Sequence, residues 1–196
     1  TRQYTFEYYP TPRSGRYYSD TSYQTMKSQI LDRLKERVLV FDGAMGTSAH
    51  SHDLPLSDYD EHENCVDILV RTRPDVVAEI HRSFLEVGCD AVSTDTFGAS
   101  KLVLGDFGLS EEARSLNRKA AEIASEQCAA FSTPDKPRFV LGSMGPGTKL
   151  PSLRQTDWDT LVDSYTAQAL GLIEGGASAL LIETCQDILQ SKSVIV

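Results

Sequence analysis

Four short segments decide the fold of this chain, and all four share one design. They are VLVFD at residues 38–42, AVSTD at 91–95, FVLGS at 139–143 and ALLIE at 179–183. Each is an apolar or β-branched run that stops at a polar residue and is followed by a turn and a helical pattern. Such runs are typical of strands, and parallel strands need helical crossovers of a dozen or more residues. The pattern predicts an α/β fold with four parallel βα units.

The polar residues that end these segments predict where ligands bind. Parallel sheets bind their ligands at the carboxyl ends of the strands. In this sequence those ends carry Asp42, Asp95, Ser143 and Glu183. We therefore expect the four side chains to share one edge of the sheet and to mark the functional site.

Helical patterns fill the connections between the predicted strands. Apolar residues recur at helical spacing over about 23–36, 75–87, 110–124 and 156–173, and again from about 187. Two architectures share this order: a doubly wound sheet and the first half of an eight-stranded barrel. The chain ends partway through an apolar helical pattern at 193–196. We therefore favour a truncated half of a (βα)8 TIM barrel, because its unpaired strand edge needs more chain.

The composition is that of an acidic globular protein. Of the 196 residues 40% are hydrophobic, and 19 Lys and Arg against 28 Asp and Glu give a net charge of -9. Because this balance repels phosphate backbones, we expect no nucleic-acid partner. No apolar run approaches the length of a membrane span and no signal peptide is visible, so we expect no membrane partner. Four cysteines without a C-x-x-C pair favour reduced thiols and a cytoplasmic location.

Two parts of different character divide the chain. Residues 1–24 hold six of the eight tyrosines, several prolines and no periodic apolar face. We interpret this part as a flexible Tyr-rich N-terminal extension. The chain starts at Thr1 and not at Met, so both of its ends look cut. Residues 25–196 are then expected to form an incomplete, N-terminal half of a barrel domain.

Two glycine-containing loops follow predicted strands. DGAMGT at 42–47 allows tight turns and close approach of a ligand to backbone N–H groups, although a structural βα turn explains it equally well. GSMGPGTK at 142–149 invites a phosphate-loop interpretation, but a P-loop needs Gly-Lys-Ser/Thr and here Thr148 precedes Lys149. G-x-G-x-x-G is absent after the first strand, which argues against dinucleotide binding.

Glu183 is the most informative of the acidic strand ends. A carboxylate at the end of an apolar strand is costly to bury unless it is paired, and the ammonium group of an amino acid would supply that pair. An internal salt bridge or a capping contact is the alternative. Asp95 carries the same argument less sharply, because neighbouring threonine hydroxyls can satisfy it. The polar run 48–64, with three histidines, could suggest a metal site but reads better as a solvated loop.

Together these segments resemble the homocysteine S-methyltransferase family, in particular the N-terminal homocysteine-binding module of cobalamin-dependent methionine synthases. The matching stretches are DGAMGT at 42–47, RPDVVAEIHRSFLEVGCDAVSTDTFGAS at 73–100, GSMGPGTKLPSL at 142–153 and ETCQDILQSK at 183–192. They occur in the family's order, and the resemblance runs from about residue 31 to the end.

The resemblance implies a (βα)8 barrel in which zinc binds the homocysteine sulfur and favours its nucleophilic thiolate. The thiolate takes a methyl group, carried on cobalamin in the methionine synthase members, and becomes methionine. By position, Asp42 and the backbone of Gly43 and Ala44 would bind the amino-acid end of homocysteine, and Glu183 would hold its ammonium. The pocket would be lined further by Thr96, Phe97 and Ser143.

The family's zinc-binding cysteines come from later strands. None of the four cysteines of this chain matches them, and Asp95 stands where some members have Asn. We therefore expect the zinc ligands beyond Val196, cobalamin in other modules, the remaining half-barrel as a partner, and no activity in this chain alone. Two alternatives stay open: a homocysteine methyltransferase with another donor, such as betaine or S-methylmethionine, and a non-catalytic α/β binding module.

Overall fold

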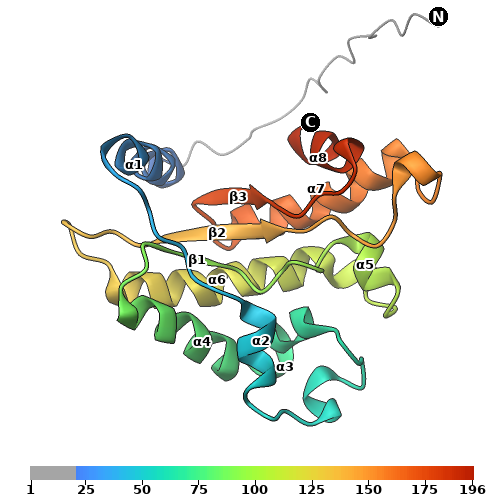
Figure 1. Cartoon of the computed structure of the whole chain (residues 1–196), viewed down its shortest axis with the longest axis horizontal. Coiled ribbons are helices and arrows are strands. Elements are labelled where there is room, and N and C mark those ends of the chain that lie inside the picture. The colour runs from blue at the N-terminus through green and yellow to red at the C-terminus, as the bar shows by residue number, and fades with distance from the viewer. Residues whose placement is uncertain (1–20) are drawn as a thin grey trace, which may run out of the picture.

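The computed structural model describes residues 21–196, with the backbone alone for 21–28. Its helices and strands in chain order are α1 (Thr21–Glu36), α2 (Met45–His50), α3 (Leu69–Thr72), α4 (Pro74–Val87), β1 (Ala91–Ser93), α5 (Lys101–Gly105), α6 (Ala113–Phe131), β2 (Phe139–Met144), α7 (Trp158–Glu174), β3 (Ala179–Ile182) and α8 (Ile188–Ile195) (Figure 1). Short 3-10 helices cover Leu56–Tyr59, Val66–Ile68, Ser110–Glu112 and Pro151–Leu153. The extension predicted over 1–24 lies, up to residue 20, outside the described residues.

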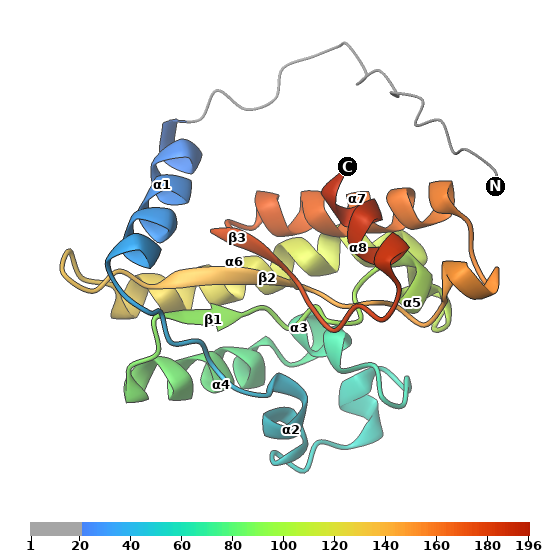
Figure 2. The ribbon, with the colours of Figure 1, turned by 45° about the horizontal axis from the view of Figure 1, so that its top comes forward.

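The three strands form one parallel sheet in the order β1-β2-β3. Ala91 lies opposite Phe139, and Leu141 lies opposite Ala179. Because neighbours in sequence are neighbours in the sheet, right-handed crossovers place the connecting helices on one face. Figure 2 shows α4, α6 and α7 following one another along that face, and α6 packs against both neighbours. The connecting helices α4, α6 and α7 thus cover one face of a three-stranded parallel α/β sheet.

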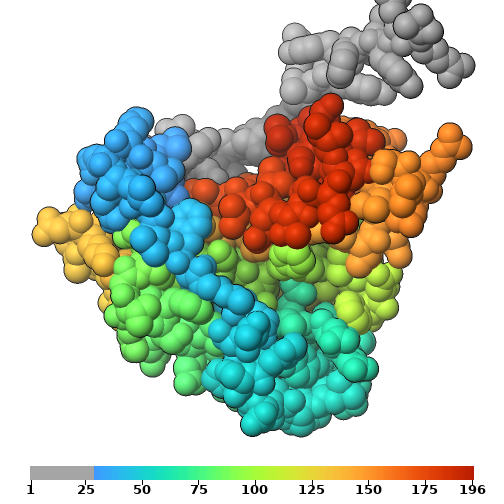
Figure 3. Space-filling model, viewed as in Figure 1, coloured from blue at the N-terminus to red at the C-terminus, as the bar shows by residue number. Residues whose placement is uncertain are grey.

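The first predicted strand, at residues 38–42, is the main correction to the predicted fold. A single isolated parallel bridge joins it to the sheet, between Phe41 and Ala91. No strand lies on its other side among the residues that the structure describes. This bridged segment runs across the surface between α1 and α2 in Figure 3, with Val38 83% and Val40 59% exposed. The fold therefore has three parallel strands and one bridged segment, not four complete βα units.

An ion pair fixes the bridged segment to the sheet. The carboxylate of Asp90, 3% exposed, accepts two hydrogen bonds from the Arg37 guanidinium, at 2.8 and 2.7 Å, and one from the Val40 amide at 2.9 Å. Bidentate charge-assisted bonds of this kind are among the strong ones. The hydrogen bonds from Arg37 are the largest cause that lowers the pKa of Asp90 to about 2. This half-exposed charge pair supplements the few backbone hydrogen bonds that join the segment to β1, such as the one from the Asp42 amide to the Ala91 carbonyl at 3.1 Å.

Both faces of the sheet are apolar, which explains why β2 is buried along its whole length. On the helix-covered face, Val140 and Met144 pack with side chains of α4, α6 and α7. On the opposite face, Phe139 and Leu141 pack with Ile30 of α1. Such double-sided burial is expected of a central parallel strand. No helix in the described range has both the length and the apolar character that crossing a membrane requires.

The structure confirms the other three predicted strands and the helices expected between them. Pro74 is the first residue of α4, and Gly88 follows its end at φ 105°, in the left-handed region that favours Gly. The structure also contains elements that the sequence did not reveal. The polar run 48–64, expected to be a loop, holds the end of α2 and a 3-10 helix.

Helices α6 and α7 approach each other so closely that two positions must be Gly. A Cβ atom at Gly171 would lie 2.3 Å from the carbonyl oxygen of Arg114, and one at Gly175 would lie 2.3 Å from that of Arg118. Their spacing of one helical turn puts them on the same face. The close crossing brings the polar side chains of α7 onto the loops at the strand ends.

We predict that Asp90→Asn loosens the bridged segment. The neutral amide loses charge-assisted bonds worth roughly 1.5–3 kcal/mol, so exchange of the Val40 amide hydrogen should accelerate about tenfold or more. Because the folded-state pKa of Asp90 is lowered, its stabilisation is present above about pH 3.9 and is lost as the pH falls through about 2. Hydrogen exchange checks this, with Asp32→Asn in the exposed face of α1 as control. Equal exchange rates in the two variants would contradict the prediction.

Candidate functional site

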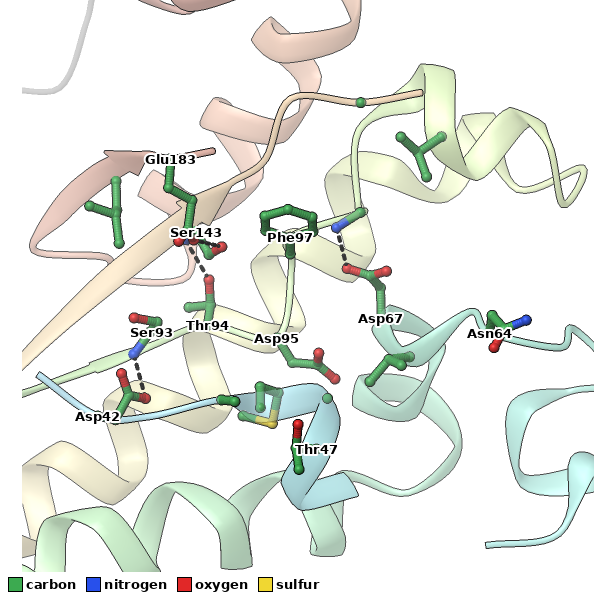
Figure 4. Close-up of a pocket in the computed structure, with 18 of the residues that line it drawn as sticks. Asp42, Thr47, Asn64, Asp67, Ser93, Thr94, Asp95, Phe97, Ser143 and Glu183 are labelled. Carbon is green, nitrogen blue, oxygen red and sulfur yellow. Dashed lines mark hydrogen bonds between the residues drawn. The ribbon is translucent and has the colours of Figure 1, made fainter. Parts of the chain in front are cut away.

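A pocket of about 830 Å³ opens at the carboxyl ends of the strands (Figure 4). Its walls come from the bridged segment, from the loops after β1, β2 and β3, and from the connection before α3. Of the predicted site residues, those that line it are Asp42, Gly43, Ala44, Phe97, Ser143 and Glu183. Asp95 lines it as well, so the four polar strand ends meet at one edge of the sheet.

Asp42 is positioned by a hydrogen bond to β1. Its Oδ2 accepts from the Ser93 amide at 2.8 Å. In a continued parallel ladder, that amide would bond to the backbone carbonyl of Asp42; the side chain takes the bond, and the chain turns away into 43–47. Burial is the largest cause that raises the pKa of Asp42 to about 6, opposed by the bonds from Ser93 and helped by the charge of Glu183. Asp42 is therefore ionised above about pH 6.

The hydrogen-bond ladder between β1 and β2 also ends where a side-chain oxygen replaces a backbone carbonyl as the acceptor. The Ser143 amide donates to Thr94 Oγ1 at 3.0 Å, where a continued ladder would use the Thr94 carbonyl. Thr96 Oγ1 lies 2.6 Å from Thr94 Oγ1 and donates to the Ser143 carbonyl at 2.7 Å. Since the Thr96 hydrogen is used on that carbonyl, Thr94 is the donor between the two hydroxyls. Side-chain oxygens thus end both ladders, and the strands diverge around the pocket.

Thr96 was expected to line the pocket, but it is not among the lining residues. Its side chain is fully buried and serves the network with Ser143. The backbone after β1 turns at once, with the Thr96 amide donating to the Thr94 carbonyl at 2.9 Å. The alternation of an extended strand therefore does not hold here, and the threonine points behind the pocket.

Glu183 lies directly after β3 and points to Ser143, as Figure 4 shows. Ser143 Oγ donates to Glu183 Oε1 at 2.5 Å, and the Glu183 amide continues the ladder to the Met144 carbonyl at 3.2 Å. Thr184 follows at φ 58°, a left-handed conformation that strains a β-branched residue. None of the ion pairs among the described residues includes Glu183, which removes the internal salt bridge as its explanation.

Helix α7 holds these loops from behind. Gln168 Nε2 donates to the Thr96 carbonyl at 2.7 Å, and the Tyr165 hydroxyl donates to the Gly145 carbonyl at 3.1 Å. The Gly145 amide in turn donates to the Phe97 carbonyl at 3.2 Å, and a Cβ atom at Gly145 would lie 2.5 Å from that oxygen. The loops after β1 and β2 are therefore locked to each other and to α7, which leaves Phe97 as an exposed apolar wall of the pocket.

Asp67 is a pocket residue that the sequence did not reveal, because it lies far from any strand end. It enters from the 3-10 helix Val66–Ile68. Its Oδ1 accepts from the Gly98 amide at 2.9 Å, and a Cβ atom at Gly98 would lie 2.7 Å from its Oδ2, so the contact requires Gly. Burial raises the pKa of Asp67 to about 6. Burial and then the charge of Asp67 raise the pKa of Asp95 well above its usual range.

The residues present do not form a zinc site. In the part of the chain that the structure describes, no group of three or more His, Cys, Asp or Glu side chains is placed to hold a metal ion. Burial raises the pKa of the Cys65 and Cys128 thiols to about 12, which disfavours the thiolate that zinc binds. Cys185 is the one partly exposed cysteine among the described residues. The described pocket therefore offers carboxylates and hydroxyls, which suit an amino acid's polar end.

Comparison with known proteins identifies the family of this chain. The family described as Homocysteine S-methyltransferase matches residues 39–196. Two methionine synthases are similar in sequence to this chain. That of Mycobacterium tuberculosis (strain ATCC 25618 / H37Rv) is 48% identical and that of Mycobacterium leprae (strain TN) 46% identical, each over 168 residues, or 86% of this chain. The match covers 14% of each of these relatives, so the chain spans a small part of their length.

Solved structures agree on the fold. The homocysteine methyltransferase MmuM from Escherichia coli superposes with a TM-score of 0.68 in its metallated form and 0.67 in its oxidised form, at 19% identity. The match covers 83% and 82% of this chain and 59% and 58% of those chains. Because the identity is low, this likeness speaks for the fold alone. The family match over most of the sequence decides the classification: the chain belongs to the homocysteine S-methyltransferase family.

Proposed function

We propose that this chain is the homocysteine-binding part of a methyltransferase that methylates the homocysteine sulfur to form methionine, as the name of its methionine synthase relatives suggests. We further propose that the three strands and the bridged segment are the first half of a (βα)8 barrel. The observation that carries the proposal is that Asp42 and Glu183, far apart in the sequence, line one pocket and interact through their charges.

The pocket suits the zwitterionic end of an amino acid. Glu183 has no basic partner within the described residues, and Ser143 holds its carboxylate at the edge of the pocket. An ammonium group placed there would pair with Glu183 and gain from the negative charge of Asp42. The backbone of Gly43 and Ala44, directly after Asp42, lines the same pocket and would meet the carboxylate end.

The rest of the barrel would cover the surface that this part leaves open. The bridged segment exposes Val38 and Val40, and β3 has no neighbour on its outer side among the described residues. Unpaired edges and apolar surface of this kind invite pairing with further chain. The small share of its relatives that the chain spans supports the same proposal. The zinc ligands and the cobalamin expected for a methionine synthase would then come from other parts of the protein.

We predict that Glu183→Gln weakens homocysteine binding by the full-length protein. A lost charged hydrogen bond is worth roughly 1.5–3 kcal/mol, or about 10- to 150-fold in the dissociation constant. Calorimetric titration with homocysteine measures this. Glu122→Gln is the control, because that carboxylate pairs with Arg118 on the exposed side of α6. Unchanged affinity in Glu183→Gln would remove Glu183 from the site and with it the central claim of the proposal.

The raised pKa of Asp42 predicts a pH dependence. Its charge is present above about pH 6 and is lost as the pH falls through that value. In the metal-free full-length protein, where the homocysteine sulfur keeps its proton, the affinity should therefore fall by roughly tenfold between about pH 7.5 and about pH 5. Asp42→Asn should flatten this slope. Asp67 titrates in the same range, so the slope that remains in the variant measures its share. A full slope in Asp42→Asn would assign the effect elsewhere.

The open surface predicts self-association of the 196-residue chain when it is produced alone. Size-exclusion chromatography should show aggregates or oligomers, and Val40→Lys on the bridged segment should reduce them, because a charge blunts an exposed edge. A soluble monomer with a sharp, cooperative thermal transition would argue that the surface needs no cover.

A further inference from the structure

The end of the pocket away from Glu183 holds two carboxyl groups that lack a cationic partner. Asp95 is 5% exposed, and its buried Oδ2 has no hydrogen-bond partner. Asp67 faces it from the opposite wall, with Thr47 and Asn64 lining the same end, as Figure 4 shows. None of the ion pairs found among the described residues includes either carboxyl group.

No neighbouring side chain among the described residues supplies the missing positive charge. Tyr59 and Cys65 lie near enough for the charge of Asp95 to raise their pKa values, and both are neutral acids. Arg71 is the cation nearest in effect, since its charge lowers the pKa of Cys65, but its guanidinium pairs with Asp60 and Glu112. A buried carboxylate without a cationic partner is unfavourable in its charged form. Burial therefore favours the protonated form of the unoccupied pair, in line with the raised pKa values of both carboxyls.

The pocket also has room for more than one ligand group. Its volume of about 830 Å³ lies in the upper part of the roughly 300–1,000 Å³ range of small-molecule sites. A small amino acid held at Glu183 would occupy only the part of this volume near Asp42 and Ser143. The end of the pocket at Asp67 and Asp95 would remain open beside the amino acid.

We propose that Asp67 and Asp95 form a second subsite, which binds an ammonium-type cation that carries N–H groups. That this cation belongs to a second ligand rests on the proposed function, in which Glu183 holds the ammonium of the amino acid. The buried Asp95 Oδ2 lacks a hydrogen-bond donor, and an N–H group supplies one. A quaternary ammonium has none and would leave that oxygen unpaired.

Occupancy of this subsite exchanges a proton for the cation. Without a ligand, burial and the charge of Asp67 raise the pKa of Asp95 and favour its protonated form; the bound cation lowers the pKa of the pair, and the proton that is released passes to the buffer. No other bond forms or breaks. The cation's affinity therefore rises with pH, and the heat of binding contains the heat of protonating the buffer.

Methylammonium chloride is the probe, titrated calorimetrically into the full-length protein at constant ionic strength in two buffers of different ionisation enthalpy. We expect saturable heat that differs between the buffers, and no saturable heat with tetramethylammonium chloride. Asp95→Asn should weaken methylammonium binding at least tenfold and abolish the buffer dependence. Asp163→Asn, an exposed carboxylate of α7 paired with Lys101, should behave like the wild type.

Two further variants keep the outcome decisive. Asp95→Asn is nearly isosteric and removes an unpaired carboxyl group, so circular dichroism should show a folded protein; Asp67→Asn, whose amide oxygen can still accept from Gly98, provides a second variant and should also lose binding. In Glu183→Gln the methylammonium response should persist, which separates this subsite from the amino-acid end. Equal heats for the two cations, or an unchanged response in Asp95→Asn, overturn the subsite. Failure of homocysteine to bind the wild type overturns the proposed function alone.

Discussion

The pocket exists because side-chain oxygens take hydrogen bonds that the backbone of a sheet would otherwise make. Asp42 accepts the Ser93 amide, and Thr94 accepts the Ser143 amide. In each case a side-chain oxygen replaces a backbone carbonyl as the acceptor, so the ladder of backbone hydrogen bonds ends but the amide stays paired. An unpaired buried amide would cost its desolvation penalty. The strands are thereby free to diverge at their carboxyl ends. The same oxygens face or support the pocket. The residues that end the ladders therefore also supply polar groups to the pocket.

The helices behind the sheet keep this opened edge in place. The close crossing of α6 and α7, which only Gly171 and Gly175 permit, presents Gln168 and Tyr165 to the loops after β1 and β2. Those side chains bond to backbone carbonyls, so they order the loops without occupying the pocket. Thr184 adds local strain directly after Glu183. Strained conformations of this kind occur where the surrounding structure over-determines the backbone, often at functional sites.

The sequence could predict the elements that depend on apolar pattern alone. Three of the four strand segments form the sheet, because a buried run between helices has few other solutions. The fourth, 38–42, shares the pattern but forms only a bridge, because the pattern reports apolar character and not the presence of a partner on each side. For a different reason, Asp67 was not predicted and Thr96 was wrongly expected to line the pocket. Their positions depend on how non-repetitive chain folds after a 3-10 helix or a strand end, where no period relates sequence to direction.

The charge of the pocket follows from the same geometry. Asp42, Asp67, Asp95 and Glu183 all line it, and no described basic side chain pairs with Asp67, Asp95 or Glu183. Burial raises the pKa values of the three aspartates, which favours protons on carboxyl groups that no described cation neutralises. A proton held at such a carboxyl is exchanged readily for a ligand's positive group, whereas an internal Arg or Lys would have to be displaced at the full cost of breaking an ion pair. A pocket that lacks its own cations is therefore prepared to take them from its ligands.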